Sequence, residues 1–442
     1  MDLNVVDFTY FCTIYKYKMR VFKFGGASVK DASAVRNVER ILTLFEGEKI
    51  VVVISAMGKT TNAMEEILSA LWKKDKSTFE TLVNERKKFH LEIIQELIQD
   101  KNHYIYQVID TTFNKLSKKI DSPLSFNFNF EYDQIVSLGE VLSTMIIAAF
   151  LENKGNSVDW ADARKLIRTD NTYREGLVDW DTTNNLINQS IGKQLETKNV
   201  IITQGFIGHT SEGFTTTLGR EGSDYTAGIF AYCLNADNVT IWKDVPGMLN
   251  ADPKWFDNTV KLDKISFKEA IELAYYGATV IHPKTIKPLQ NKGIPLYVKS
   301  FIDPGSNGTV VQELTEFDNK TPSFIFKMNQ LYLSLTPKDF SFIVEENLSD
   351  IFKKLAELNA KINLMQNSAL SFSVVLDRDK IDLDNLLAKF KSTYAVSFQE
   401  NLEMVTIRHY DQPTLERVLN QKEVIIEQKS KETARILMKD LD

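Results

Sequence analysis

Short apolar runs alternate with amphipathic stretches along the first two thirds of the chain. Arg20 to Phe24 and Lys49 to Ser55 are continuous apolar runs, typical of strands that are buried on both faces of a parallel sheet. Between them, Ala32, Val35 and Val38 recur at helical spacing. Further strands are predicted at 157–160, 200–203, 239–242 and 296–300, and further helices at 63–119, from 132, at 181–196, from 223 and at 265–276. This alternation predicts an α/β fold, an open and largely parallel sheet sandwiched by helices.

The pattern changes towards the C-terminus. The segment 311–329 lacks a clear period and is predicted to be a linker. Residues 330–400 follow as strand, helix, strand, strand, helix and strand, the order of an α+β ferredoxin-like plait. Residues 401–442 begin a second unit of this kind but end after one strand, one helix and two further strands, so we expect a shortened copy.

Composition narrows the class of protein. A chain of 442 residues holds two or three domains, and 43% hydrophobic with 25% charged residues is ordinary for a globular protein. The net charge of −6 argues against nucleic acid as a main partner. An uninterrupted apolar run of about 18 residues is not evident in the sequence, so no membrane-spanning helix is expected. The two cysteines, Cys12 and Cys233, make neither a disulfide framework nor a zinc site, which suits a reducing cytoplasm.

The first eighteen residues are aromatic-rich but carry Asp2 and Asp7 and no small-residue cleavage site, which does not suit a signal peptide. We expect residues 1–18 to be a disordered leader, with Met19 as the working start.

The stretch from Gln204 to Ala227 carries the strongest chemical signal. It follows a predicted strand, is rich in glycine and threonine, and leads into a helix that begins near Ser223. Backbone N–H groups at a helix N-terminus attract phosphate, and glycines allow close approach. Arg220 and Asp224 lie within this turn. The alternative is a surface loop with a capping Ser223 or Asp224.

A second strand-loop-helix unit lies near the start of the chain. Lys23 precedes Gly25 and Gly26, so its ammonium could reach a phosphate held on the loop. The lysine comes before the glycines, and the spacing of a Walker loop is absent. A third loop, Ala56 to Asn62, follows the strand at 49–55, and loops at one edge of an open α/β sheet build a ligand site.

Together these motifs resemble aspartate kinase, a member of the amino acid kinase superfamily. The matching segments are KFGGASV at 23–29, VSLGE at 136–140, TTTLGREGSDYTA at 215–227, WKDVPG at 242–247 and YGATVIHP at 276–283. The resemblance implies an amino acid kinase catalytic domain over 19–310, with ACT-type regulatory domains behind it. It also implies transfer of the γ-phosphoryl of ATP, with Mg²⁺, to the side-chain carboxylate of L-aspartate, the first step towards lysine, threonine and methionine.

The resemblance and the chemistry together assign roles. Lys23 is expected at the transferring phosphoryl group and Asp224 as the group that orients it. Arg220 suits the α-carboxylate of aspartate, Glu140 the α-ammonium, and Thr61 adds a hydroxyl contact. The ATP-binding residues are expected to be Lys23, Gly25, Gly26, Ser28, Ser55, Gly222, Ser223, Lys243, Asp244, Leu249, Lys254 and Thr279. No protein metal site is predicted, because Mg²⁺ prefers phosphate oxygens and water.

One departure from the family pattern matters. Many members carry a phosphate-facing lysine where this chain has Thr279, and threonine where it has Lys243. We therefore hypothesise that Lys243 supplies the second cation; the alternative is a surface lysine at a strand end.

The resemblance also predicts partners. A homodimer through the C-terminal domains is expected, with lysine or threonine as a possible effector, although the shortened second unit puts feedback inhibition in doubt. Two other functions stay open: another amino acid kinase, acting on glutamate or acetylglutamate, and a non-catalytic amino-acid sensor.

Overall fold

The computed structural model describes residues 18–256, 258–278, 281–318, 321–339 and 341–441. The predicted leader therefore lies outside the described residues, apart from Lys18. The chain divides into two compact units: one runs to Pro246 and resumes over Lys284–Val310, and the other comprises Gly247–Pro283 and Val311–Asp442.

A largely parallel sheet forms the centre of the first unit, as the sequence predicted. Its strands lie in the order β3-β4-β2-β1-β7-β9-β10. The strands are β1 (Met19–Phe24), β2 (Lys49–Ile54), β3 (Val158–Ala161), β4 (Val200–Gln204), β7 (Asn238–Lys243), β9 (Leu296–Ser300) and β10 (Thr309–Gln312). A separate hairpin pairs β5 (Ile207–His209) with β6 (Thr215–Thr217).

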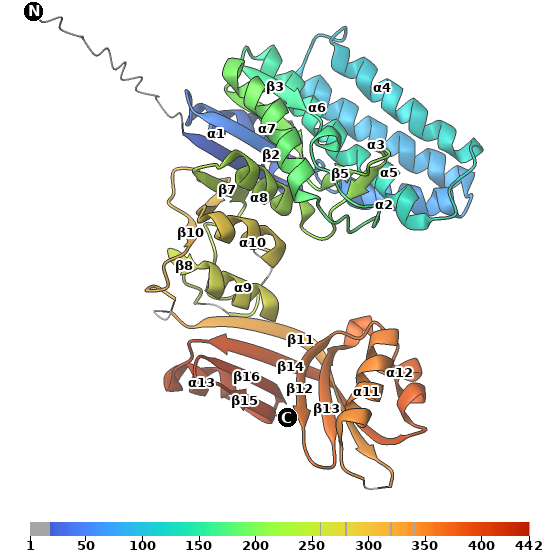
Figure 1. Ribbon diagram of the computed structural model, residues 1–442, viewed down its shortest axis with the longest axis vertical. Coiled ribbons are helices and arrows are strands. Elements are labelled where there is room, and N and C mark those ends of the chain that lie inside the picture. Colours follow the sequence, from blue (N-terminus) through green and yellow to red (C-terminus); the bar gives the residue numbers. More distant parts are fainter. Residues whose placement is uncertain (1–17, 257, 279–280, 319–320, 340, 442) are drawn as a thin grey trace, which may run out of the picture. The chain divides into compact units, whose positions relative to one another are not determined.

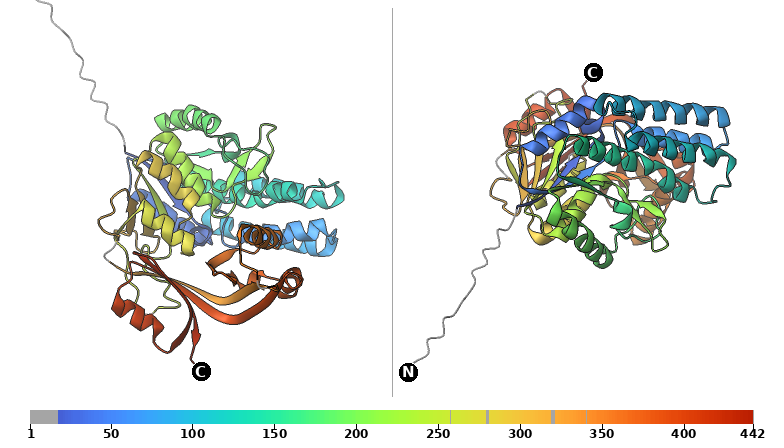
Figure 2. Two further views of the ribbon diagram at one scale, coloured as in Figure 1. Left: turned by 60° about the horizontal axis from the view of Figure 1, so that its bottom comes forward. Right: turned by 90° about the horizontal axis from the view of Figure 1, so that it is seen from above.

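Helices cover both faces of this sheet (Figures 1 and 2). They are α1 (Ala32–Thr43), α2 (Thr60–Trp72), α3 (Lys76–Leu97), α4 (Tyr104–Ser117), α5 (Phe128–Val136), α6 (Leu138–Asn153), α7 (Trp180–Thr197), α8 (Gly222–Leu234) and α10 (Pro283–Lys292). Short 3₁₀ turns occupy η1 (Gly26–Val29), η2 (Lys118–Asp121) and η3 (Ala163–Lys165).

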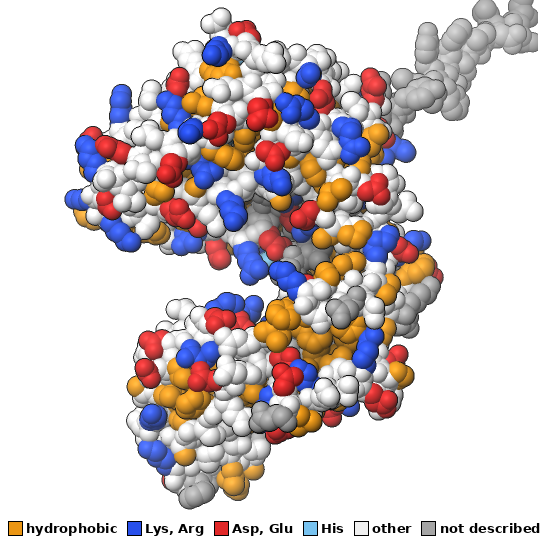
Figure 3. All heavy atoms as spheres, turned by 180° about the vertical axis from the view of Figure 1, so that it is seen from behind, with side chains coloured by type: hydrophobic (Ala, Val, Ile, Leu, Met, Phe, Trp, Pro, Cys, Tyr) orange, Lys and Arg blue, Asp and Glu red, His pale blue; other side chains and the backbone are white. Residues whose placement is uncertain are grey.

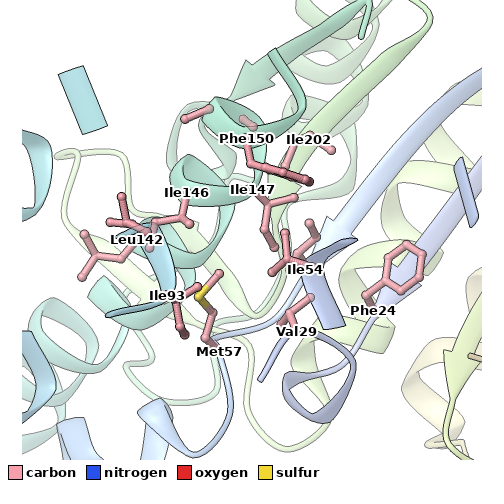
Figure 4. Close-up of a cluster of buried hydrophobic side chains, with 14 of the residues drawn as sticks. Phe24, Val29, Ile54, Met57, Ile93, Leu142, Ile146, Ile147, Phe150 and Ile202 are labelled. Carbon is pink, nitrogen blue, oxygen red and sulfur yellow. The ribbon is translucent and has the colours of Figure 1, made fainter. Parts of the chain in front are cut away.

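The largest apolar cluster of the first unit lies where α1, α3 and α6 meet the sheet. Phe24 and Ile54 reach it from β1 and β2, and Ile147 and Phe150 from α6; all four are fully or almost fully buried (Figure 4). Apolar side chains on both faces of the central strands explain why those strands read as continuous apolar runs.

The stretch Phe128–Asn153 comprises α5 and α6, and by length and composition it is apolar enough to cross a membrane. We did not identify this apolar stretch from the sequence. However, 83% of its most apolar window is buried inside the first unit. Its apolarity is that of a core helix, so the stretch is weak evidence for a membrane span.

Charged side chains cover the surface of the first unit. On the face in Figure 3, basic and acidic groups are interspersed over its helices, without a broad patch of one sign. Nucleic-acid binding calls for such a basic patch, so this face gives no support for that partner.

The second unit is built on one antiparallel sheet with the order β12-β13-β11-β14-β16-β15 (Figures 1 and 2). Its strands are β11 (Ser323–Pro337), β12 (Ile362–Asn367), β13 (Phe372–Asp377), β14 (Tyr394–Arg408), β15 (Lys422–Lys429) and β16 (Thr433–Asp440). The short strand β8 (Lys264–Ser266) belongs to the second unit but not to this sheet. Its helices are α9 (Phe267–Tyr276), α11 (Glu345–Glu357), α12 (Leu383–Phe390) and α13 (Gln412–Leu419), with the 3₁₀ turn η4 (Arg378–Lys380).

The two predicted plaits share their long strands, which differs from the expected division at residue 400. β11 and β14 are each 15 residues long and pair from Ser323 opposite Arg408 to Pro337 opposite Tyr394. A bulge near Gln330 shifts the register, and Asn329 and Asn401 have φ values of 49° and 58° there. The boundary therefore falls inside a continuous strand.

The predicted linker at 311–329 also differs from the structure. Residues from Ser323 onwards form the first half of β11 and pair with the second half of β14. The first half of β11 is therefore the fourth strand of the second plait, beside β14, β16 and β15. Read from the sequence alone, this plait lacks a strand, because that strand comes before the first plait.

Residues 247–283, expected within the catalytic domain, belong to the second unit. Helix α9 is held there by Glu269, whose carboxylate accepts hydrogen bonds from Arg408 at 2.6 and 3.1 Å. The backbone N–H of Ser266, at the start of α9, donates to Asp318 at 2.7 Å.

Candidate active site

The loops after β1 and β2 are packed against each other. A Cβ on Gly26 would lie 2.7 Å from the carbonyl oxygen of Gly58, so only glycine fits this position. The Gly58 N–H donates to the Gly26 carbonyl at 3.0 Å. Gly26 therefore allows the backbones of the two loops to approach closely at the carboxyl edge of the sheet.

Lys23 and Lys243 share one carboxylate. They end adjacent parallel strands, with Lys23 opposite Ile241 in the register of β1 and β7. Lys23 Nζ lies 2.7 Å from Asp224 Oδ1, and Lys243 Nζ lies 3.9 Å from Asp224 Oδ2. Asp224 is 3% exposed and Lys23 9%. Asp224 thus pairs with two ammonium groups, of which Lys23 is nearly buried and Lys243 is on a side chain that is 25% exposed.

Helix α8 begins with an unusual turn that carries Arg220. Gly219 and Glu221 on either side of it have φ values of 79° and 55°, both in the left-handed region. A Cβ on Gly222 would lie 2.7 Å from the ring of Phe206, and one on Gly205 would lie 2.5 Å from Cβ of Ser223. These glycines let the turn pack closely at the N-terminus of α8, where backbone dipoles favour an anion.

Glu140 is a buried carboxylate in the first turn of α6. It is 2% exposed, and its Oε2 atom has no hydrogen-bond partner among the described residues. Burial raises its pKa to about 8, although hydrogen bonds from the Ala56 N–H and the Thr61 side chain act in the opposite direction. A ligand that brings a positive charge or a donor would satisfy this group.

A cavity of about 880 Å³ in the first unit brings most of the predicted residues together. Those that line it are Lys23, Ser55, Thr61, Glu140, Arg220, Gly222, Ser223, Asp224 and Lys243. Most of them come from the ends of different strands and from the loops and helix starts that follow, which is the placement expected of a ligand site in an open α/β sheet, whereas Glu140 comes from α6.

Other predicted residues do not line this cavity. Gly25 lies beside it, since a Cβ there would be 3.4 Å from Lys23 Nζ. Ser28 is buried under the loop, and its hydroxyl lies 3.5 Å from the carbonyl oxygen of Trp242. Leu249 and Lys254 belong to the second unit, Asp244 and Gly26 are in the first but not on the cavity wall, and Thr279 lies outside the described residues.

The sequence did not point to several other lining residues. They are Asn129, Tyr132, Thr172, Tyr173, Arg174, Glu175, Phe206, Thr217, Gly219 and Glu221. Most lie outside the segments that carried the motifs, although Thr217, Gly219 and Glu221 fall within one of them. The buried carboxylate of Asp133 ties two of the segments together, because it accepts from the N–H groups of Arg174 and Thr217 at 3.0 and 2.9 Å.

This arrangement defines a class of site. Glycine-tight loops, two lysines on one carboxylate and a helix N-terminus suit a phosphorylated ligand, whereas Arg220 and Glu140 suit the two charged groups of an amino acid. Among the described residues, no group of three or more His, Cys, Asp or Glu side chains could hold a metal ion. The loops, the two lysines and the arginine together have the chemistry expected of a phosphotransferase site.

Comparisons with known proteins agree with this class. The model of the amino acid kinase family matches residues 18–300. The chain is 31% identical over 398 residues to the lysine-sensitive aspartokinase 3 of Escherichia coli K12, covering 88% of this chain and 86% of that protein. Two solved structures of E. coli aspartokinase III, one with lysine and aspartate and one with aspartate and ADP, match with TM-scores of 0.79 and 0.76 at 27% identity. Each match covers 95% of this chain, and 95% and 96% of the respective solved chains.

The chain therefore belongs to the amino acid kinase family, and within it to the aspartokinases. These are ATP-dependent kinases that phosphorylate the side-chain carboxylate of L-aspartate. The fold and the class of activity implied by the sequence motifs are thereby confirmed.

Proposed function

We propose that aspartate and ATP meet in the cavity of the first unit, with Lys23 at the transferred phosphoryl group. The observation that carries this proposal is the position of Lys23, nearly buried at the end of a central strand, with its ammonium fixed by Asp224. Charge gathers on the phosphoryl oxygens during transfer, and a pre-oriented cation in a site with little water stabilises it.

Aspartate is proposed to bind between Arg220 and Glu140. The guanidinium of Arg220 suits the α-carboxylate because it can donate two parallel hydrogen bonds to a planar anion. The orphaned oxygen of Glu140 would accept from the α-ammonium, which favours the ionised carboxylate, and Thr61 adds a hydroxyl. Phosphorylation of a carboxylate removes no proton, so a general base is not required.

ATP is proposed to place its phosphates against the loop of Gly25 and Gly26 and the start of α8, with Lys243 as the second cation. The ion pair of Lys243 with Asp224 supports this role over that of a surface lysine. Ser28, Ser55, Gly222 and Ser223 stay predicted phosphate-side residues, and Asp244, Leu249, Lys254 and Thr279 stay predicted contacts of the nucleotide.

Magnesium is proposed to enter with ATP. The carboxylate of Asp224 is occupied by two lysines, and the described residues offer no acidic cluster, so the metal would keep phosphate oxygens and water as ligands. When bound, it would neutralise part of the phosphate charge.

A coupled assay of ADP release tests the proposal directly. The purified chain should release ADP with aspartate, but not with glutamate or acetylglutamate at the same concentration. Release with glutamate or acetylglutamate instead would identify a different amino acid kinase, and no release with any of them would favour a sensor without catalysis.

We further propose lysine as the effector and a homodimer as the assembly. A lysine-sensitive relative and a relative solved with lysine support the first, and the second plait, complete with its strand from β11, removes one reason to doubt regulation. Threonine stays a weaker candidate. ADP release with lysine, threonine or methionine added, and sedimentation of the purified chain, test these two proposals.

A cytoplasmic location is also proposed. Cys233 is a free, buried thiol, which is what a reducing compartment favours. Imaging of a tagged chain in the native cell would test this location.

A further inference from the structure

Arg174 is a cavity residue whose backbone is firmly placed. Its φ of 71° is in the left-handed region, which costs free energy for a residue with a side chain. Its N–H donates to the buried Asp133 carboxylate at 3.0 Å, and the N–H of Gly176, two residues on, donates to the Thr217 carbonyl at 2.9 Å. The segment around Arg174 is therefore held in one conformation at the cavity wall.

The side chain of Arg174 is pre-oriented by an aromatic ring. Its guanidinium carbon lies 4.2 Å from the centre of the Tyr132 ring, within the range of a cation–π contact. Tyr132 is 7% exposed, and its hydroxyl donates to the Glu65 carboxylate at 2.6 Å. A guanidinium stacked on a ring keeps the N–H groups in its plane available, and these match the two oxygens of a carboxylate.

Arg174 and Arg220 lie on loops that touch each other. A Cβ on Gly219, next to Arg220, would lie 3.4 Å from the carbonyl oxygen of Arg174. Both arginines line the same cavity, and in the part of the chain that the structure describes neither forms an ion pair with a carboxylate, although the charge of Arg174 acts to lower the pKa of the nearby Asp133. The lysines differ, because both are compensated by Asp224. The cavity thus holds two ammonium groups that are ion-paired with Asp224 and two guanidinium groups without an ion pair among the described residues.

We infer that Arg174 is a further aspartate-binding residue, which together with Arg220 makes a pair of guanidinium groups for the two carboxylates of the amino acid. The inference rests on the proposed function. Arg220 takes the α-carboxylate, and Arg174 contacts the side-chain carboxylate, which offsets part of its repulsion from the triphosphate. A substrate with one carboxylate fewer would lose this contact.

Steady-state kinetics on Arg174→Gln and Arg174→Lys test the inference. We expect Arg174→Gln to raise the KM for aspartate by at least about tenfold, as the loss of a charged hydrogen bond implies, and to leave the KM for ATP unchanged. Arg174→Lys should fall short of the wild type, because an ammonium neither stacks in the same way nor donates two parallel bonds. Arg164→Gln is the matched control, since Arg164 pairs with Asp162 at 2.7 Å and does not line the cavity.

A second pair of variants separates binding from folding. Tyr132→Phe keeps the ring and should change the KM for aspartate less than Tyr132→Leu, which removes the support for Arg174. Thermal melting of each variant checks that the first unit stays folded.

Three results would overturn the inference: an unchanged KM for aspartate in Arg174→Gln, a rise confined to the KM for ATP, or equal effects in the Arg164→Gln control. If the wild type does not phosphorylate aspartate, the proposed function fails instead, and the same assay shows which of the two has failed.

Discussion

Lys23 Nζ lies 2.7 Å from Asp224 Oδ1, although Lys23 is near the end of β1 and Asp224 is in the first turn of helix α8. Both side chains are nearly buried, so each charge depends on the other. The same carboxylate reaches Lys243 at 3.9 Å. The carboxylate of Asp224 therefore brings together three motifs that are far apart in the sequence, at 23–29, 215–227 and 242–247.

The role of Asp224 predicts the effect of its removal. Asp224→Asn should lower kcat on the order of 100-fold, because a small displacement of a catalytic group costs about that much. Lys23 loses its anchor in this variant, whereas the aspartate contacts of Arg220 and Glu140 stay. The KM for aspartate should therefore change little. Stopped-flow measurement of ADP formation checks this, and an undiminished kcat would contradict the orienting role.

Lys243→Ala tests whether this lysine acts on the phosphates. Removal of one cation from the transferring group should lower kcat at saturating ATP by about 100-fold. Lys193→Ala, on the exposed side of α7, is the control and should behave as the wild type. An unchanged kcat for Lys243→Ala would leave only the surface-lysine interpretation.

Glu140 gives a pH dependence with a defined sign. Its pKa is raised from 4.5 to about 8, so the native state binds one more proton than the unfolded state between these two values. Its contribution to stability is therefore largest below pH 4.5 and is lost as the pH rises towards about 8. Glu140→Gln should lack this loss and melt at a higher temperature than the wild type near pH 8.

The same variant should bind aspartate less well. In the wild type the KM for aspartate should fall as the pH rises towards about 8, because the ionised carboxylate binds the ammonium. In Glu140→Gln the KM should be high and independent of this ionisation. Higher stability combined with weaker binding is the signature; a lower melting temperature with an unchanged KM would mean a structural role.

The pair of Glu269 and Arg408 predicts the stability of the second unit. Their side chains are 4% and 6% exposed, and His409 Nε2 also lies 3.0 Å from the Glu269 carboxylate. Arg408→Leu should destabilise the unit by about 3–5 kcal/mol, since it leaves a buried carboxylate without its main partner. The double variant Glu269→Leu/Arg408→Leu should recover much of the loss. Calorimetry of the full chain measures both, and equal losses would argue against a charge effect.

Lowering the pH should weaken the stabilisation that Glu269 and Arg408 give to the second unit. Burial alone raises the pKa of Glu269, but hydrogen bonds from His409 and Arg408 and their charges lower it below its ordinary value. The stabilisation is therefore present above the unfolded pKa of 4.5 and is lost as the pH falls through the lower, folded value.

Much of the first unit could be predicted because its signals are local. The apolar run at 49–55 closely matches β2 (Lys49–Ile54), and the predicted strand at 296–300 is β9. Strands buried on both faces leave a continuous pattern that needs no knowledge of their neighbours. Lys23, Arg220 and Glu140, which line one cavity, could be singled out for the same reason, since each lies in a short motif.

The remaining features depend on contacts between distant segments. The first half of β11 looked like the end of a linker, because its pairing with Arg408 and its neighbours has no trace in the local sequence. Arg174 lies in no recognisable sequence motif either. Its position in the cavity wall depends on contacts with Tyr132, Asp133 and Gly219, which lie on other segments. Long-range pairing and shared carboxylates are properties of the fold that a local pattern cannot contain.

The most direct test of the account is phosphorylation of aspartate by the wild type and by Lys23→Met, with the product trapped as its hydroxamate. We predict aspartyl hydroxamate from the wild type, and a kcat lower by at least about 100-fold in the variant, with melting and aspartate binding largely preserved. Product formed at the wild-type rate by Lys23→Met would contradict the central role of this lysine.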